Sequence, residues 1–124
     1  MTWVFDDKLP IYLQIIQILK ADIARGKYQT GEKLPAVREL ALTAGVNPNT
    51  MQKALSELER SGLVYSQRTS GRFITEDAAL IQNLKRELAH MQIQEFLHKM
   101  KGFGFDFQEI IDLIKALMEE EKNE

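Results

Sequence analysis

Apolar residues recur at helical spacing over most of this chain, and the pattern begins with a helix near the N-terminus. Between residues 10 and 26, apolar side chains repeat every three or four positions, which is typical of one face of an α-helix. Gly26 is expected to end this helix, because glycine readily takes the left-handed conformation of a helix C-terminus. Residues 28–34 are predicted to form a connector. We expect the core-facing side of the helix to consist of Tyr12, Ile16, Leu19 and Ile23, with a second apolar seam of Ile11, Ile15 and Ile18 beside it.

Two short amphipathic helices follow, separated by a tight turn at Gly45. The first is expected to begin near Pro35, whose fixed φ suits a first helical turn. The second is expected to begin after Asn47, a residue type that caps helix N-termini through its side-chain oxygen, and to run to about Ser61. Apolar side chains at spacings i, i+3, i+4 and i+7 predict its inner face, which consists of Met51, Ala54, Leu55 and Leu58.

A two-stranded hairpin is predicted after the second short helix. Residues 63–66 and 72–75 are rich in β-forming side chains, and Thr-Ser-Gly at residues 69–71 forms the turn between them. Helix, turn, helix and hairpin in this order make up a winged helix-turn-helix, in which one helix enters the DNA major groove. We therefore assign residues 1–75 to a winged helix-turn-helix DNA-binding domain that ends before Glu76.

The remaining residues, 76–124, predict two further helices with long apolar faces. The first, over residues 78–101, carries a coiled-coil-like seam, and the second begins after an N-cap at Asp106. The two faces are larger than two helices can bury against each other, so we expect a C-terminal dimerisation region in a two-fold homodimer. The alternative is that both helices fold back on the winged domain. The residues expected at the dimer interface are Leu84, Leu88, Met91, Phe96, Ile110, Ile114 and Leu117.

The predicted fold class is therefore mainly α with a small β-hairpin: a winged helix-turn-helix followed by a two-helix dimerisation tail. Composition agrees, since 44% hydrophobic and 27% charged residues suffice for the core of a small domain with an appendage. There is no cysteine, no apolar run long enough to span a membrane and no basic, apolar leader. We therefore expect a cytoplasmic protein without disulfides and without membrane contact.

The charge distribution favours DNA binding although the net charge is −2. Residues 1–75 carry a formal charge of +3, whereas residues 76–124 carry −5. Binding to phosphates depends on local clusters of basic residues, so the overall sign does not decide the matter.

The exposed side of the second short helix carries the candidate DNA-reading residues. Its N-terminal part presents short polar side chains that donate and accept hydrogen bonds, namely Asn47, Asn49, Thr50 and Gln52. Asparagine and glutamine bond adenine edges bidentately, and Lys53 suits guanine or phosphate. The alternative, a solvated polar face on a small helical domain, is made less favourable by the wing and by the charge distribution.

Arginines near the turn and at the wing tip are expected to add charged contacts. Arg38 projects from the first short helix towards the turn, where it suits a phosphate or a base; the alternative is an ion pair with Glu39 or Asp22. Arg68 and Arg72 flank the wing tip, and a wing arginine can enter the minor groove. For Arg72, solubilising the hairpin is an almost equally good interpretation.

Two histidines are the only candidates for metal chemistry. His90 and His98 lie eight residues apart in the predicted long helix, without the i, i+4 spacing of a helical metal-binding pair. Surface histidines are the favoured interpretation, and a small metal-sensing protein is the alternative. No Ser/His/Asp set, glycine-rich phosphate loop or pair of catalytic carboxylates is recognisable, so we expect no enzyme activity, no cofactor and no metal.

Two sequence blocks resemble the GntR family of bacterial transcription regulators. They are Leu-Pro-Ala-Val-Arg-Glu-Leu-Ala at residues 34–41 and Gly-Val-Asn-Pro-Asn-Thr-Met-Gln-Lys-Ala-Leu at residues 45–55. The Pro-Ile-Tyr-Leu-Gln-Ile opening at residues 10–15 and Gly-Arg-Phe-Ile at residues 71–74 agree with the family pattern. The Asn-Pro-Asn-Thr form and a tail limited to residues 76–124 look most like the YtrA subfamily.

The resemblance implies a sequence-specific DNA-binding regulator, usually a repressor, that binds a palindromic operator as a homodimer. Three departures limit what can be carried over. Ala36 stands where the family often has serine, and Thr69 replaces a common wing glycine. Pro48 and Gln52 stand where other subfamilies have arginines, so base preference does not transfer. The DNA contacts that the resemblance implies are Arg38, Asn47, Asn49, Thr50, Gln52, Arg68, Thr69 and Ser70.

The tail is too short for a deep ligand pocket of the kind found in larger members of the resembled family. An effector that releases the DNA would therefore bind at the dimer interface or between the tail and the winged domain. The rival interpretation of the whole chain is an interaction module that uses its winged helix to bind protein. Salt-dependent DNA binding, which such a module lacks, separates the two hypotheses.

Overall fold

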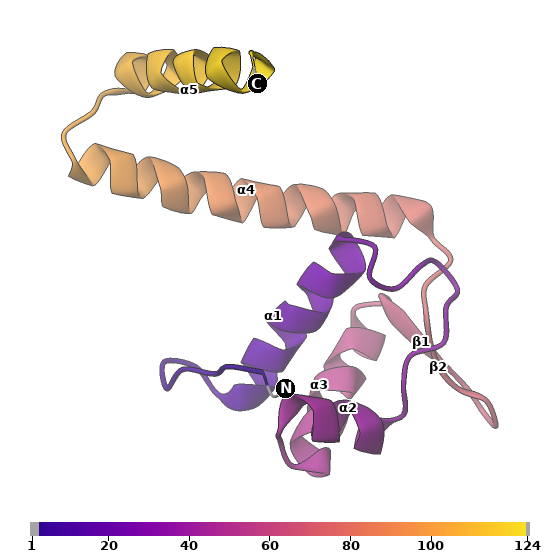
Figure 1. Ribbon diagram of the computed structural model, residues 1–124. Coiled ribbons are helices and arrows are strands. Elements are labelled where there is room, and N and C mark those ends of the chain that lie inside the picture. The colour runs from indigo at the N-terminus through magenta and orange to yellow at the C-terminus, as the bar shows by residue number, and fades with distance from the viewer. Residues whose placement is uncertain (1–2, 124) are drawn as a thin grey trace. The chain divides into compact units, whose positions relative to one another are not determined.

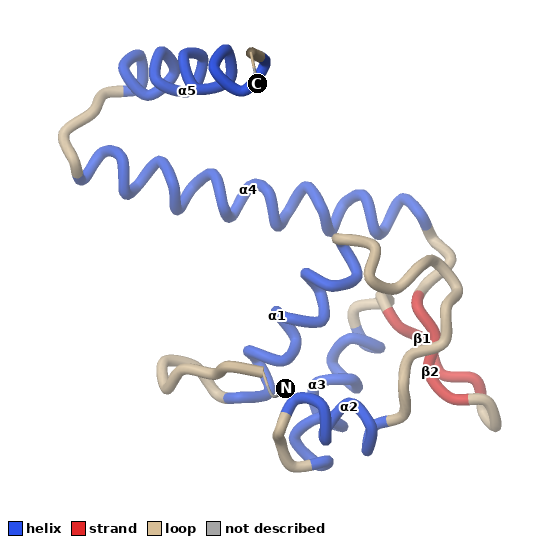
Figure 2. The backbone as a smooth tube through the Cα atoms, viewed as in Figure 1, coloured by secondary structure: helices blue, strands red, loops and turns tan. Residues whose placement is uncertain are grey.

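The computed structural model describes residues 3–123, and this range contains five helices and one two-stranded antiparallel sheet. The fold is mainly helical, with a winged helix-turn-helix followed by two C-terminal helices, which confirms the predicted fold class. The elements are α1 (Ile11–Ala24), α2 (Val37–Ala44), α3 (Pro48–Arg60), β1 (Val64–Gln67), β2 (Gly71–Ile74), α4 (Ala78–Gly102) and α5 (Phe107–Lys122) (Figures 1 and 2).

The chain forms two compact units, and the division between them falls inside α4. The first unit ends at Arg86 and the second begins at Glu87. The first turns of α4 belong to the first unit because Ile81 and Leu84 are buried there. The structural division therefore lies later in the chain than the expected domain boundary before Glu76.

The core of the first unit lies between α1 and α3, with α2 and the hairpin packed beside them (Figure 1). Ile15 and Leu19 of α1 meet Met51, Leu55 and Leu58 of α3, and each of these side chains is at most 1% exposed. Burying a side chain of this size contributes roughly 1.5–3 kcal/mol. The inner face predicted for α3 is confirmed in full.

The buried face of α1 is rotated slightly from the predicted one. Ile15 is fully buried, whereas Tyr12 and Ile16, which we expected in the core, are only half-buried. The reason is Gln14, whose side chain is covered by the N-terminal segment. Its Nε2 donates to the carbonyl oxygens of Asp6 (2.9 Å) and Leu9 (2.7 Å). The helix is therefore covered on two sides, which apolar spacing alone does not reveal.

The predicted connector over residues 28–34 contains an additional edge of the wing. The backbone N–H of Leu34 donates to the carbonyl oxygen of Arg72 (2.8 Å), and that of Ile74 donates to the carbonyl oxygen of Glu32 (2.8 Å). Residues 31–34 therefore run antiparallel beside β2 and anchor the hairpin to the start of α2. This segment carries no alternating apolar pattern, so its strand-like pairing could not be predicted locally.

The second unit contains the rest of α4 and the whole of α5. The predicted N-cap of α5 is confirmed: Asp106 Oδ1 accepts a hydrogen bond from the Glu109 backbone N–H (2.8 Å), and Glu109 Oε1 accepts one from the Asp106 backbone N–H (3.1 Å). This reciprocal capping box satisfies two of the free donors at the helix start. Within residues 3–123, no helix combines the length and apolar character needed to cross a membrane.

Candidate nucleic-acid interface

The turn between α2 and α3 is built from residues with definite local roles. Gly45 has a φ of 76°, a left-handed conformation that favours glycine, and its N–H donates to the carbonyl oxygen of Ala41 (2.9 Å). Asn47 caps α3, because its Oδ1 accepts a hydrogen bond from the Asn49 backbone N–H (2.8 Å). Pro48 occupies the first helical position, as predicted. These contacts define where α3 begins and which of its side chains point outward.

The outward side of α3 carries most of the predicted DNA-reading residues. Asn49, Gln52 and Lys53 are exposed, and Thr50 is half-buried. Asn47 is exposed too, but its oxygen is engaged in the cap, so its amide N–H groups remain for a donor contact. The structure thus brings the five predicted side chains onto the first two turns of one helix, opposite its buried face.

Lys53 is held against α1. Its Nζ lies 3.9 Å from the centroid of the Tyr12 ring, which is a cation–π contact between the two helices. To reach a base, the Lys53 ammonium would have to leave the Tyr12 ring. A DNA phosphate alongside α1 is therefore a more suitable partner for Lys53 than guanine.

Arg38 is exposed at the second position of α2. Asp22, one of the two alternative partners considered for it, forms an ion pair with Lys27 instead, with 3.5 Å between Nζ and Oδ2. Among residues 3–123, no ion pair involves Arg38. Its guanidinium is therefore available to a phosphate or a base.

The wing is a short hairpin with a three-residue tip. β1 pairs with β2 from Val64 opposite Ile74 to Gln67 opposite Gly71, so the loop contains only residues 68–70. Positive φ occurs only at glycines within the described residues, and here it falls on Gly71 (107°). Thr69 therefore replaces the common wing glycine without backbone strain. The tip residues Arg68, Thr69 and Ser70 are all exposed.

Arg72 connects the wing to α3, a role that the sequence did not indicate. Its Nε lies 2.5 Å from Oε1 of Glu59, which also accepts a hydrogen bond from the Ser66 hydroxyl (2.5 Å). Its Nη1 donates to Oε1 of Gln52 (3.3 Å). The Arg72 side chain is only 17% exposed, so it neither reaches into solvent as a minor-groove contact nor solubilises the hairpin.

Glu59 is kept ionised by these neighbours. The hydrogen bond from Ser66, assisted by the Arg72 guanidinium, lowers the pKa of Glu59 below its ordinary value of 4.5 despite partial desolvation. Sequence reasoning passed over both Glu59 and Ser66. The available signal was a half-buried acidic residue on α3, which suggests an internal partner.

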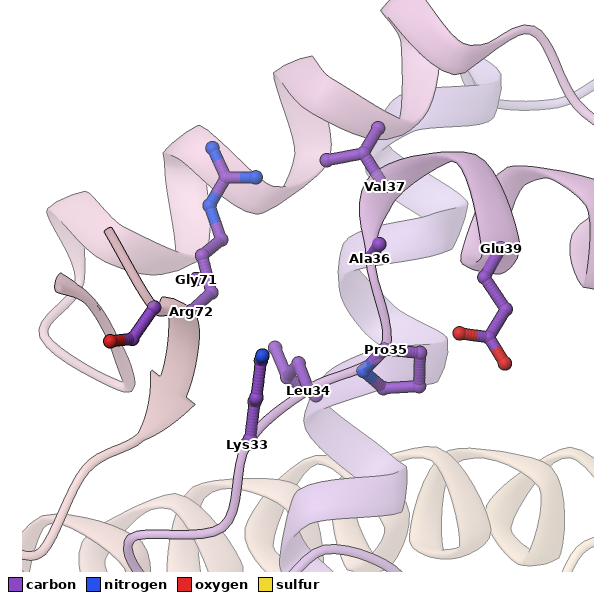
Figure 3. A pocket seen from close by; sticks show the side chains of 9 residues that line it. Lys33, Leu34, Pro35, Ala36, Val37, Glu39, Gly71 and Arg72 are labelled. Atoms are coloured by element: carbon purple, nitrogen blue, oxygen red, sulfur yellow. The ribbon is translucent and has the colours of Figure 1, made fainter. Parts of the chain in front are cut away.

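A groove of about 640 Å³ separates the start of α2 from the wing. Figure 3 shows Lys33 and Arg72 on one side of it and Pro35 and Ala36 at the start of α2 on the other. The carboxylate of Glu39 points away from both basic side chains (Figure 3). The groove therefore has a basic wall and a helix N-terminus, a combination that suits the negative charge of DNA phosphates.

The residues expected at a dimer interface fall into two groups. Leu84 is 4% exposed and Ile110 is 1% exposed, so both are covered within one copy of the chain and are not free to contact a second copy. The reason for Leu84 is that the start of α4 packs into the first unit. Leu88 is half-buried. The other four remain 39–59% exposed, namely Met91, Phe96, Ile114 and Leu117.

Both histidines, His90 and His98, are exposed on α4. Among residues 3–123, no group of three or more histidine, aspartate or glutamate side chains is arranged to hold a metal ion.

Comparison with known proteins identifies the family. The model of the bacterial regulatory proteins of the gntR family matches residues 11–74. The HTH-type regulator YhcF of Bacillus subtilis is 39% identical over 115 residues, which cover 93% of this chain and 95% of YhcF. The HTH-type transcriptional repressor YtrA of the same organism is 36% identical over 110 residues, covering 87% of this chain and 84% of YtrA.

Solved structures agree with the sequence matches. A GntR family transcriptional regulator from Listeria monocytogenes superposes with a TM-score of 0.81 at 38% identity, covering 90% of this chain and 98% of that one. The domain AraR(DBD), solved in complex with operator ORE1, matches with a TM-score of 0.53 at 30% identity, covering 60% of this chain and 93% of the domain.

Proposed function

We propose that this chain, which belongs to the GntR family and is a DNA-binding transcriptional regulator rather than an enzyme, is a homodimeric repressor of a palindromic operator. The observation that carries the proposal is the exposed start of α3, where Asn49 and Gln52 stand beside the groove-forming wing. A helix presented in this way enters the major groove, where amide side chains read base edges.

The proposed DNA contacts divide by chemistry. Asn47, Asn49, Thr50 and Gln52 suit base edges or nearby phosphates, because they offer neutral hydrogen-bonding groups at the start of α3. Arg38 and Lys53 supply charge on either side of that helix start. The wing tip, residues 68–70, reaches the adjacent backbone or the minor groove. Phosphate contacts position the protein and base contacts specify the sequence.

Dimerisation is proposed from the apolar side chains left exposed in the second unit. Along α5, Ile111, Ile114, Leu117 and Met118 are 39–57% exposed and lie at positions i, i+3, i+6 and i+7, which share one side of a helix. A two-fold axis buries such a stripe against its own copy. It also presents two copies of α3 to half-sites about one turn of DNA apart, which makes the operator a palindrome.

The proposal includes repression of transcription by the bound dimer and its release from DNA by a small effector. YtrA is named a transcriptional repressor, and a dimer of this chain bound to its operator would repress by blocking access to a promoter. We place this action in the cytoplasm, where bacterial DNA lies. A small effector would release the DNA by weakening the dimer or by shifting its two reading helices apart.

One experiment tests the central claim. The purified protein is titrated against the DNA upstream of its own gene by fluorescence anisotropy at several salt concentrations, and the bound site is footprinted. We expect a protected palindrome and a steep loss of affinity with salt. No protected site and no salt dependence would overturn the proposal and favour the protein-binding module. Sedimentation at the same concentrations should show a dimer.

A further inference from the structure

The Gln52 amide is held in one orientation by a neighbour that cannot accept a hydrogen bond. Arg72 Nη1 donates to Oε1 of Gln52 across 3.3 Å. A guanidinium carries five N–H donors and no acceptor, so only the amide oxygen of Gln52 can face it. The Nε2 group of Gln52 is therefore left to face away from Arg72, and Gln52 itself is exposed on the reading side of α3.

Arg72 is itself anchored at three elements. Its Nε lies 2.5 Å from Glu59 Oε1 on α3, the same oxygen accepts the Ser66 hydroxyl from β1, and Arg72 belongs to β2. The Arg72 and Glu59 side chains are 17% and 30% exposed, so the ion pair is partly shielded from water. Such a charge-assisted contact is stronger and more definite in geometry than an exposed pair.

This arrangement changes what a glutamine at position 52 can recognise. A free glutamine bonds adenine bidentately, with its N–H donating to N7 and its oxygen accepting from the N6 amino group. Here the oxygen already has a donor, and the positive guanidinium beside it repels a second amino hydrogen. The remaining amide hydrogens fit a base edge that carries only acceptors, and guanine presents two neighbouring acceptors, O6 and N7.

We propose that Arg72 is a specificity-determining residue that acts through Gln52, presenting its amide as a donor so that the protein prefers guanine over adenine at the base pair facing it. This inference rests on the proposed function, since it requires that the start of α3 reads an operator. Glu59 and Ser66 are positioning residues that hold the Arg72 guanidinium in place.

The test compares base preference at single operator positions. The full-length protein is bound to its footprinted operator and to every single base-pair variant of one half-site. The Gln52→Ala variant identifies the position at which discrimination disappears. At that position we expect the unmodified protein to favour guanine over adenine roughly tenfold.

Arg72→Met keeps a long side chain but removes the donor, and it should reduce or reverse this preference while leaving discrimination at the other positions unchanged. Arg60→Met is the control, because Arg60 lies on α3, forms an ion pair with Glu57, and has a side chain that is 81% exposed. The control should lower affinity slightly for all operators and leave the preference intact. Glu59→Gln removes the charge that pairs with Arg72 but keeps an oxygen that can accept its hydrogen bond. This variant should shift the guanine preference in the same direction as Arg72→Met, by a smaller factor.

The outcomes separate this inference from the function on which it rests. A preference for adenine in the unmodified protein, or an unchanged guanine preference in both Arg72→Met and Glu59→Gln, would overturn the inference while operator binding stands. Equal losses at every position in Arg72→Met, with the thermal midpoint of unfolding preserved, would also overturn it. If Arg72→Met does not fold, Glu59→Gln decides alone. Absence of operator binding by the unmodified protein would overturn the proposed function and this inference with it.

Discussion

The two units of this protein treat their apolar side chains in opposite ways. In the first unit, Ile15, Met51 and Leu58 of the helical core are not measurably exposed. In the second, Met91, Phe107 and Leu117 leave 55–59% of their surface exposed, although they lie in regular helices, of which α5 begins with a capping box. The winged unit therefore has a closed core, whereas the second unit leaves much of its apolar surface exposed.

This difference suggests that the first unit serves DNA recognition and the second serves association. A unit with a closed core can hold the start of α3 and the wing in a definite geometry, which base recognition requires. A unit with a continuous exposed apolar stripe has surface left for association, and burial of that stripe is the driving force available for it. Substitutions should accordingly change folding in one unit and assembly in the other.

The largest expected effect is a loss of folding stability from Leu58→Ala in the closed core. Truncating a fully buried leucine costs about 3 kcal/mol, through lost transfer free energy and the cavity left behind. Urea denaturation followed by circular dichroism measures it. Leu42→Ala is the control, because Leu42 is 82% exposed and its truncation should change the free energy of unfolding by less than about 0.5 kcal/mol. Equal losses from both would contradict the closed core.

Leu117→Glu should act on assembly and not on the fold of the winged unit. Placing a charge in an apolar interface should weaken the dimer by about 2 kcal/mol, roughly 30-fold in its dissociation constant, because the carboxylate must lose its hydration. Analytical ultracentrifugation follows the change. Lys115→Glu, a charge change at an exposed polar position of the same helix, should leave the dimer intact. A dimer that is equally stable in both variants would exclude the α5 stripe as the interface.

Arg38→Ala should weaken operator binding by about tenfold while leaving both folding and dimerisation unchanged. The reason is that its guanidinium has no ion-pair partner among residues 3–123 and lies at the start of α2. Competition binding with specific and unrelated DNA shows whether the lost contact was to a base or to a phosphate. Arg25→Ala, which removes an exposed arginine at the end of α1, should have little effect. Unaltered operator affinity in Arg38→Ala would remove this residue from the interface.

Asn47 should show that capping and DNA contact are separable. Asn47→Ala removes the cap and should cost about 1 kcal/mol of stability as well as affinity for the operator. Asn47→Asp keeps an oxygen for the Asn49 N–H but loses the amide donor, so stability should be retained and affinity should still fall. Thermal unfolding and anisotropy titrations measure the two quantities. Retained affinity in Asn47→Asp would restrict Asn47 to the cap.

The smallest expected effect is a dependence of stability on acid pH that originates at Glu59. Because the pKa of Glu59 is lower in the folded protein than its ordinary value of 4.5, ionised Glu59 stabilises the fold above that pH. This contribution is lost as the pH falls from about 4.5 through the lowered pKa. Glu59→Gln should therefore narrow the difference in melting temperature between pH 6 and pH 3. Identical pH profiles in the two proteins would mean that ionisation of Glu59 adds no net stability.

The elements near sharp local signals could be predicted from sequence. Asn47 and Asp106 begin their helices where expected, Gly45 takes the left-handed conformation, and the inner face of α3 is the predicted one. Each depends on contacts within a few residues. Ile16 was expected in the core instead of Ile15. The N-terminal segment covers α1 on a second side through Asp6 and Leu9, and apolar spacing within the helix does not reveal this packing.

The sequence predicted which residues make up the candidate site but not the contacts between them. The exposed amides of α3 and a wing with a basic tip follow from spacing and turn chemistry, although the loop contains residues 68–70 and not the predicted 69–71. The link from Arg72 to Glu59 joins residues thirteen positions apart, and the contact from Arg72 to Gln52 joins residues twenty apart. The spacing of apolar residues does not predict such pairs, since they form only when the hairpin folds back against α3.

The sequence by itself determined where the helices begin and end, which face of α3 is buried, and that the protein reads DNA, because these depend on local dihedral preferences and on the spacing of apolar side chains. The tertiary structure alone decided that residues 31–34 extend the wing, that Leu84 is buried in the first unit, and that Gln52 Oε1 accepts a hydrogen bond from Arg72. Those features depend on which distant groups are brought within hydrogen-bonding or van der Waals distance. That is a property of the packed chain and not of any segment in it.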